Sequence, residues 1–262
     1  MDALPFAQEL LGALSGVLVG FSLGLVGGGG SILAVPLLVY VVGVKLPHLA
    51  IGTSAVAVAA NAMASLATHA RAGNVRWPCA AVFATAGVLG ALGGARLGKM
   101  VDGHVLLAAF AGMMIVVAVL MIRRREPAED LRVRLNRQNA PALAGAGLGA
   151  GALSGFFGIG GGFLIVPGLV AATGMPMLQA VGTSLVAVTA FGLTTAGSYA
   201  ASGFVNWPLA AVFVAGGVAG SLVGARAAIG LARRRGMLTK VFAGIILAVA
   251  AYMLARSLSA SF

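Results

Sequence analysis

Residues 27–36 read GGGGSILAVP, and residues 158–167 read GIGGGFLIVP. In each block a run of glycine interrupts an apolar segment, and a short apolar stretch then leads to a Val-Pro pair. A glycine run in hydrocarbon would leave backbone N–H groups unpaired, which costs several kcal/mol for each group. Such a run is therefore expected only inside protein or beside a wet cavity.

The two blocks open an internal repeat that covers most of the chain. Three further blocks recur in the same order, 130 residues apart: AIGTSAVAV at 50–58 and AVGTSLVAV at 180–188, GNVRWPCAAVF at 73–83 and GFVNWPLAAVF at 203–213, and GALGGARLG at 90–98 and GSLVGARAA at 220–228. The glycine blocks are 131 residues apart, so one residue is gained or lost between Pro36 and Gly52. This pattern indicates two copies of one unit. We expect a first transmembrane repeat over 1–122, a charged linker over 123–141 and a second transmembrane repeat over 142–262.

The composition places both copies in a membrane. Of the 262 residues, 60% are hydrophobic and 9% are charged, and the mean hydropathy is +1.04. A soluble domain carries about 25% charged residues, so these values exclude a soluble enzyme, a disordered chain and a conventional nucleic-acid-binding protein. The net charge of +11 lies mostly in short clusters between apolar stretches, which is typical of cytoplasmic loops. The sequence predicts an all-α polytopic membrane protein.

Each copy holds about four or five helical segments. The apolar stretches fall at about 10–26, 31–43, 49–70, 77–98 and 104–122, and then at about 142–157, 162–173, 180–201, 207–230 and 237–257. The first two stretches of each copy are short and are separated by the glycine run. Each such pair is compatible with one long broken helix, two tilted spans or a re-entrant hairpin that enters and leaves on one side.

The charges favour two copies of opposite orientation. The linker 123–141 holds six arginines and three of the six acids, and we place it in the cytoplasm. Inverted copies put Arg71, Arg76 and the basic cluster 233–240 on the same side as the linker, as the positive-inside bias requires. Parallel copies of four spans would put Arg233 to Arg235 outside. Inverted repeats with glycine-broken helices are an architecture of secondary transporters.

The glycine runs are the predicted binding site. The helix that follows each run would point its free N–H groups and its positive dipole end back at the run, which makes an anion site. The Gly-Thr-Ser triplets begin the next apolar helix, and their hydroxyls would complete the shell, although helix capping explains them equally well. We predict as substrate-binding residues Gly28, Gly29, Gly30, Ser31, Thr53, Ser54, Asn61, Gly160, Gly161, Gly162, Thr183 and Ser184.

The acids support an anionic substrate. None of the six acids lies in the middle of an apolar stretch, whereas cation carriers and proton pumps place carboxylates within the membrane. Arg96 and Arg226 match each other and are candidate anion-path arginines, although snorkelling to the headgroups explains them as well. Asn61 either lines the path or bridges helices, and His69 is expected at the membrane interface. We expect no catalytic residues, no metal site and no cofactor, and the single cysteine, Cys79, excludes an internal disulfide.

Together these motifs resemble the sulfite exporter TauE/SafE family of membrane transporters. The paired glycine block ending in Val-Pro, the Gly-Thr-Ser triplet, the Trp-Pro helix start at 77–78 and 207–208 and the Gly-Ala-Arg carry the resemblance, which covers nearly the whole chain except the linker. The resemblance implies transport of sulfite or an organosulfonate across the bacterial inner membrane. The residues themselves do not select sulfur over phosphate or carboxylate.

From both lines we expect a secondary transporter of a small oxyanion that works by alternating access in the bacterial cell membrane. Its partners would be the anion, the lipid bilayer and a coupling ion, either proton or sodium, with no nucleic acid and with a homodimer as one oligomeric option. An anion channel of the same fold and a carrier of a non-sulfur anion are the alternatives.

Overall fold

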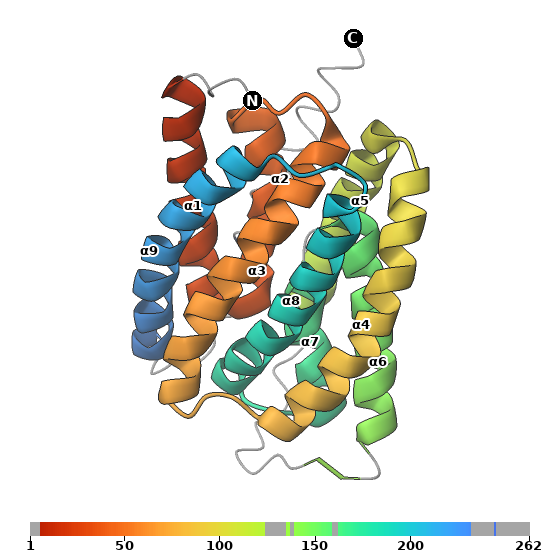
Figure 1. Ribbon diagram of the computed structural model, residues 1–262. Helices are drawn as coiled ribbons and strands as arrows, with labels where there is room; N and C mark the ends of the chain where they lie inside the picture. Colours follow the sequence, from red (N-terminus) through yellow and green to blue (C-terminus); the bar gives the residue numbers. More distant parts are fainter. Residues whose placement is uncertain (1–5, 124–134, 137–138, 159–161, 232–243, 245–262) are drawn as a thin grey trace.

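The chain folds into a bundle of helices. The computed structural model describes residues 6–123, 135–136, 139–158, 162–231 and 244, and every regular element among them is helical (Figure 1). The first copy contains α1 (Phe6–Val26), the 3-10 helix η1 (Gly27–Leu33), α2 (Ala34–Pro36), the π-helix η2 (Leu37–Val41), α3 (Pro47–Arg71), α4 (Trp77–Met100) and α5 (Gly103–Arg123). The second contains α6 (Ala140–Phe157), α7 (Gly162–Thr173), α8 (Met177–Ala200) and α9 (Trp207–Leu231). The all-α prediction is confirmed for this part of the chain, and the predicted stretch at 237–257 lies outside it, apart from residue 244.

The described helices suit a lipid environment. Six helical stretches are long and apolar enough to cross a membrane: Ala7–Val41, Pro47–Arg71, Trp77–Met100, Ala140–Phe157, Met177–Ala200 and Trp207–Leu231. Large apolar side chains such as Leu14, Leu89 and Leu193 are exposed on the outside of the bundle, where water would disfavour them and lipid does not. The protein is therefore an integral membrane protein.

Glycines in the left-handed region of backbone space mark the turns. They form three pairs related by the repeat: Gly27 with Gly158, Gly43 with Gly174, and Gly73 with Gly203. Because Gly43 and Gly174 are still 131 residues apart while Gly52 and Gly182 are 130 apart, the residue gained or lost falls in the loop that follows the second pair. Changing the length of such a loop costs little.

Two helix pairs hold the copies together, and each pair takes one helix from each copy. Helix α1 packs along α9, and α6 packs along α4 (Figure 1). A Cβ at Gly20 would overlap the backbone carbonyl of Gly217, and a Cβ at Gly151 would overlap that of Gly87. Glycines spaced four residues apart let such helices approach at the backbone. The repeat maps the first pair of helices onto the second.

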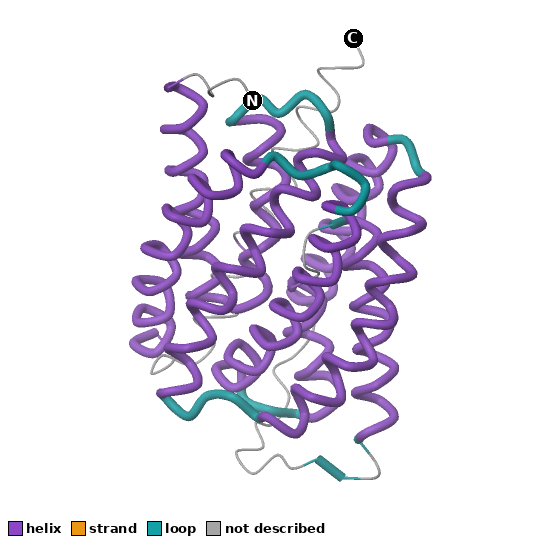
Figure 2. Tube along the Cα trace, in the orientation of Figure 1, coloured by secondary structure: helices purple, strands orange, loops and turns teal. Residues whose placement is uncertain are grey.

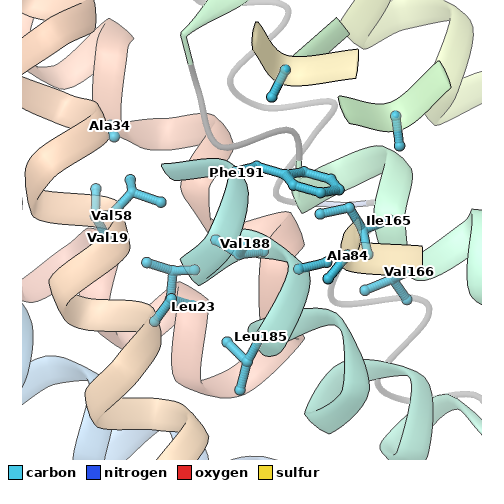
Figure 3. Packing of buried hydrophobic residues seen from close by; sticks show 14 of the residues in the cluster. Val19, Leu23, Ala34, Val58, Ala84, Ile165, Val166, Leu185, Val188 and Phe191 are labelled. Carbon is cyan, nitrogen blue, oxygen red and sulfur yellow. The ribbon is translucent and has the colours of Figure 1, made fainter. Parts of the chain in front are cut away.

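Helices α3 and α8 pack against each other between these pairs. Val58 on α3 and its repeat counterpart Val188 on α8 are fully buried in one apolar cluster, which Figure 3 shows reaching from Val19 and Leu23 to Ile165. Phe191 extends this cluster and stacks on Phe83, with ring centroids 6.3 Å apart. The core of the molecule is thus shared by the two copies.

The ends of the bundle also carry matched features. The loop that follows α3, at 72–76, and the loop that follows α8, at 201–206, lie at opposite ends (Figure 2). Trp77 and Trp207 begin the helices after these loops and are 55% and 57% exposed. Exposed tryptophans at helix starts suit membrane interfaces, so each end of the bundle has one such side chain.

Candidate functional site

The first glycine run forms a sharp turn buried inside the protein. Gly27 has φ +67°, a conformation that glycine adopts without strain, and it ends α1. The chain then folds back along α1. Gly30 lies so close to α1 that a Cβ at this position would overlap the backbone of Ser22 and Leu23. Residues 27–32 are all buried. The run therefore lies inside protein, as the cost of unpaired amides requires.

A hydroxyl from the other copy contacts this turn. The backbone N–H of Gly28 donates to Ser184 Oγ over 3.0 Å, and Ser184 Oγ donates to the carbonyl of Val181 over 2.7 Å. Ser31 Oγ donates to the carbonyl of Gly28 over 2.8 Å. The structure thus brings together three of the predicted residues, Gly28, Ser31 and Ser184.

The second glycine run has a matching beginning. Gly158 has φ +68° and ends α6, as Gly27 ends α1. Ser54 Oγ donates to the carbonyl of Ile51 over 2.8 Å and lies 3.5 Å from the carbonyl oxygen of Gly158. Gly162 begins α7, and Gly160 and Gly161 lie outside the described residues. The serine of each Gly-Thr-Ser triplet therefore contacts the glycine turn of the other copy.

The two predicted threonines contact loops. Thr53 Oγ1 accepts a hydrogen bond from the backbone N–H of Asn206 over 3.0 Å, and Thr183 Oγ1 accepts one from the backbone N–H of Arg76 over 3.0 Å. Both hydroxyls are fully buried. Thr53 thus joins α3 to the start of α9, and Thr183 joins α8 to the start of α4.

The remaining predicted residues lie apart from one another. Asn61 is fully buried on α3, and its amide packs on Gly217 of α9. Arg96 and Arg226 are both exposed. An exposed arginine near the end of an apolar helix matches the snorkelling interpretation, so the structure places these two side chains on the outside of the bundle.

Several buried polar side chains have atoms without a hydrogen-bond partner. In the described part of the chain, the side-chain atoms in this state are Asn61 Nδ2 and Oδ1, Ser65 Oγ, His69 Nδ1, Ser154 Oγ, Thr195 Oγ1 and Tyr199 OH. His69 lies near the end of α3, and its side chain is 0% exposed and contacts Gly24 of α1, so it is packed inside the bundle while its position at the membrane interface stays a prediction. The available signal was the spacing of Asn61, Ser65 and His69 at intervals of four residues, which puts them on one face of a helix.

Comparisons with known proteins agree with this architecture. The sequence profile of the family described as "Sulfite exporter TauE/SafE" matches residues 12–253. A "probable membrane transporter protein" of Xylella fastidiosa (strain Temecula1) is 49% identical over 250 residues, which cover 93% of this chain and 94% of that relative. The "probable membrane transporter protein YdhB" of Bacillus subtilis is 28% identical over 213 residues, covering 80% of this chain and 86% of the relative.

A third relative matches a shorter part of the chain. The "probable membrane transporter protein MJ0441" of Methanocaldococcus jannaschii is 29% identical over 181 residues, covering 64% of this chain and 65% of the relative. No solved structure matches the chain. The family profile spans both copies of the repeat, with their glycine turns and Gly-Thr-Ser triplets, so the chain is a membrane transporter that belongs to the sulfite exporter TauE/SafE family.

Proposed function

We propose that the chain is a secondary transporter of a small oxyanion, with sulfite or an organosulfonate as its substrate, in the bacterial inner membrane. The observation that carries this proposal is the reciprocal contact between the copies. The glycine turn at Gly28 is held by Ser184, and the turn at Gly158 lies against Ser54. Two amide-rich turns inside an apolar bundle, each next to a hydroxyl, suit an uncharged site that binds and releases a monoanion.

The two copies are proposed to be inverted repeats, each with a re-entrant segment. Three observations support this interpretation. The loops 72–76 and 201–206 lie at opposite ends of the bundle (Figure 2), and each bears an exposed tryptophan at the next helix start. The chain also folds back on α1 at Gly27. In transporters built from inverted repeats, substrates bind where the repeats meet.

The proposed anion site consists of the two glycine turns and the hydroxyls next to them. Amides of Gly28 to Ser31 and of Gly160 to Gly162 would bind the oxyanion, and Ser54 and Ser184 would exchange their present hydrogen bonds for the anion. Asn61 would line the path. Thr53 and Thr183 would reach the anion only after releasing Asn206 and Arg76, so they are proposed to respond to opening of the bundle.

These two threonine contacts support alternating access as the proposed mechanism. The Thr53–Asn206 and Thr183–Arg76 hydrogen bonds each join the copies beside one of the two opposite loops, and both are formed together. We infer that one breaks when the site opens to one side of the membrane and the other breaks when it opens to the opposite side. Because the two contacts are equivalent under the repeat, neither state is strongly favoured by them.

Transport by purified protein in liposomes tests the function. Uptake of labelled sulfite and sulfoacetate is compared with uptake of phosphate and acetate. Saturable uptake with counterflow of the sulfur oxyanions supports the proposal. A current that rises linearly with driving force indicates the channel alternative, and saturable uptake of phosphate or acetate alone indicates a carrier of another anion.

Variants locate the site in the same assay. Gly29→Val and Gly161→Val are expected to abolish transport while the protein still inserts into the membrane, because valine fills the space beside the amides. Gly93→Val is the matched control, since a Cβ at Gly93 meets nothing within 4 Å. Normal transport by the first two variants would show that the glycine turns are not the site.

A further inference from the structure

Helix α3 carries a line of buried polar side chains with atoms that find no partner in the described part of the chain. Asn61, Ser65 and His69 follow one another at intervals of four residues, and all three side chains are 0% exposed. Both amide atoms of Asn61, Ser65 Oγ and His69 Nδ1 have no hydrogen-bond partner among the residues that the structure describes. Residues four apart share one face of a helix, so these groups form a continuous polar stripe, called here the α3 stripe.

Such a stripe costs free energy in an apolar bundle. A buried polar group without a partner destabilises a fold by about 1–3 kcal/mol. The corresponding positions of α8 are Phe191, Thr195 and Tyr199, and Thr195 Oγ1 and Tyr199 OH are likewise buried without a partner among the described residues. Unpaired hydroxyls therefore occur in both copies, whereas the amide and the imidazole occur in the first copy alone, and we look for a solute or proton that uses them.

The imidazole of His69 has an unprotonated, basic nitrogen. Its Nε2 lies 3.1 Å from the carbonyl oxygen of Gly24. Because a carbonyl only accepts hydrogen bonds, Nε2 must carry the hydrogen, and in the neutral ring Nδ1 is then the unprotonated nitrogen. That nitrogen is buried without a partner. Imidazole is the side chain whose charge changes most readily near neutral pH, so Nδ1 is a proton-binding atom.

The surroundings favour a proton only when an anion comes with it. Gly24 lies in the last turn of α1, where the carbonyl end of the helix dipole attracts positive charge.

The described elements packed against α3 carry the following titratable or charged residues: Glu9 on α1, Tyr40 on η2, His104 and Arg123 on α5, Tyr199 on α8 and Arg226 on α9. On α3 itself, His48 and Arg71 complete the set.

These neighbours supply no buried counter-charge for an imidazolium. Glu9 is the single acid among them, and it is exposed. Arg226 and Arg71 are exposed as well, and Tyr199 packs against Gly52 and His48, near the other end of α3. A buried unpaired charge is strongly disfavoured, so the negative charge that balances a protonated His69 must come from a solute.

We propose that His69 binds the proton that crosses the membrane together with the transported anion, which makes this protein a proton–anion symporter. The proposal rests on the proposed function and names its coupling ion. The proton binds at Nδ1, and no covalent bond other than N–H forms or breaks. The Gly24 carbonyl that holds the ring lies three residues before the turn at Gly27, so the proton site adjoins the proposed anion site.

The coupling has a simple physical origin. A buried imidazolium alone and a buried anion alone are each disfavoured, whereas the pair is close to neutral. Each ligand therefore raises the affinity for the other by the same factor. A monoanion and one proton carry no net charge across the membrane, so a gradient of one pH unit is expected to drive about tenfold accumulation of the anion.

The experiment uses purified protein in liposomes that contain a pH-sensitive dye. Isethionate is the probe, because it is a monoanion whose sulfonate group stays ionised and carries no proton of its own at neutral pH. For the unmodified protein, proton and anion are expected to enter together, and an imposed proton gradient is expected to drive uphill uptake. His69→Gln should keep downhill exchange but lose proton movement and uphill uptake. His48→Gln, a half-buried histidine outside the stripe, should behave like the unmodified protein.

A second variant guards against misfolding of His69→Gln. The chain has three histidines, so His69 is the single histidine in a His48→Gln, His104→Gln background. In that background 2-fluorohistidine can replace His69, and it has the same shape but is far less basic. Loss of proton movement in that protein supports the proposal. Anion transport without proton movement in the unmodified protein, or proton movement retained after either change at His69, overturns it. If the unmodified protein carries no anion in any gradient, the proposed function itself has failed.

Discussion

The hydroxyl of Thr53 on α3 accepts a hydrogen bond from the backbone N–H of Asn206, 153 residues later in the chain, over 3.0 Å. Thr183 on α8 does the same for Arg76 over the same distance. In both cases the N–H group belongs to the residue just before a Trp-Pro helix start. Each bond therefore fixes the loop of one copy against the long central helix of the other.

Removing one of these bonds is expected to bias the protein toward one open state. Thr53→Val keeps the shape of the side chain and removes the acceptor, which costs about 1 kcal/mol and shifts a two-state equilibrium about fivefold. Thr183→Val should shift the same equilibrium in the opposite direction. The measurement is the labelling rate of single cysteines placed in the loops 72–76 and 201–206, in a Cys79→Ala background.

Thr85→Val is the control for that pair of variants. Thr85 is exposed, and its hydroxyl donates to carbonyls of its own helix, those of Ala81 and Val82. Its replacement should leave both labelling rates unchanged. Equal changes in the two loops for Thr53→Val and Thr183→Val would contradict opposite roles for the two contacts.

Glycine-to-alanine changes should differ in their effect on stability between glycines at close helix contacts and glycines that face open space. At Gly20 and Gly151 a Cβ would overlap a backbone carbonyl of the partner helix, so either change should destabilise the protein by about 1–3 kcal/mol. At Gly93, where a Cβ meets nothing, alanine should stabilise the helix by about 0.5–1 kcal/mol. Thermal unfolding can be followed with a thiol-reactive dye, because Cys79 is buried and is the single cysteine. Equal melting temperatures for the three variants would contradict this assignment.

Much of the helical layout was predictable because hydrophobicity and glycine placement decide it. The predicted stretch 162–173 coincides with α7, and the predicted start at 77 is the first residue of α4. Helix α3 begins at Pro47, two residues before the predicted 49, because a proline in the first helical turn loses no hydrogen bond. Local signals of this kind suffice for helix boundaries.

The site was less predictable, because it depends on contacts between the copies. The Gly-Thr-Ser triplet gave no indication that its serine would contact a glycine turn while its threonine contacts a loop, and both partners belong to the other copy. The burial of His69 was also missed, since its proximity to Arg71 and to the end of an apolar stretch is typical of an interface. Only the packing of α1 against α3 places the Gly24 carbonyl beside the ring.

The two serines should differ in their effect on stability. Ser184→Ala leaves the buried N–H of Gly28 without an acceptor, which costs about 1–3 kcal/mol. Ser54→Ala should cost less, because the contact of Ser54 with Gly158 is longer, at 3.5 Å, and its shorter bond stays within its own helix. Melting temperatures of the two variants give the comparison, and a larger loss for Ser54→Ala would contradict it. Both variants should weaken anion binding if these hydroxyls belong to the site.

Asn61→Leu should raise stability and reduce transport. The amide of Asn61 is fully buried and has no partner within the described ranges, so an apolar side chain of similar size removes an unfavourable group and should stabilise the fold by up to about 2 kcal/mol. If the amide lines the path of a hydrated anion, the same change removes a needed contact, and initial uptake rates should fall at least severalfold. Phe191→Leu is the matched control at the equivalent position of α8, where an apolar residue replaces another in the core and should cost stability with little effect on the rate per folded molecule. A stabilised Asn61→Leu protein with normal transport would show that the amide takes no part in the path, whereas a destabilised one would show that the amide has a structural partner.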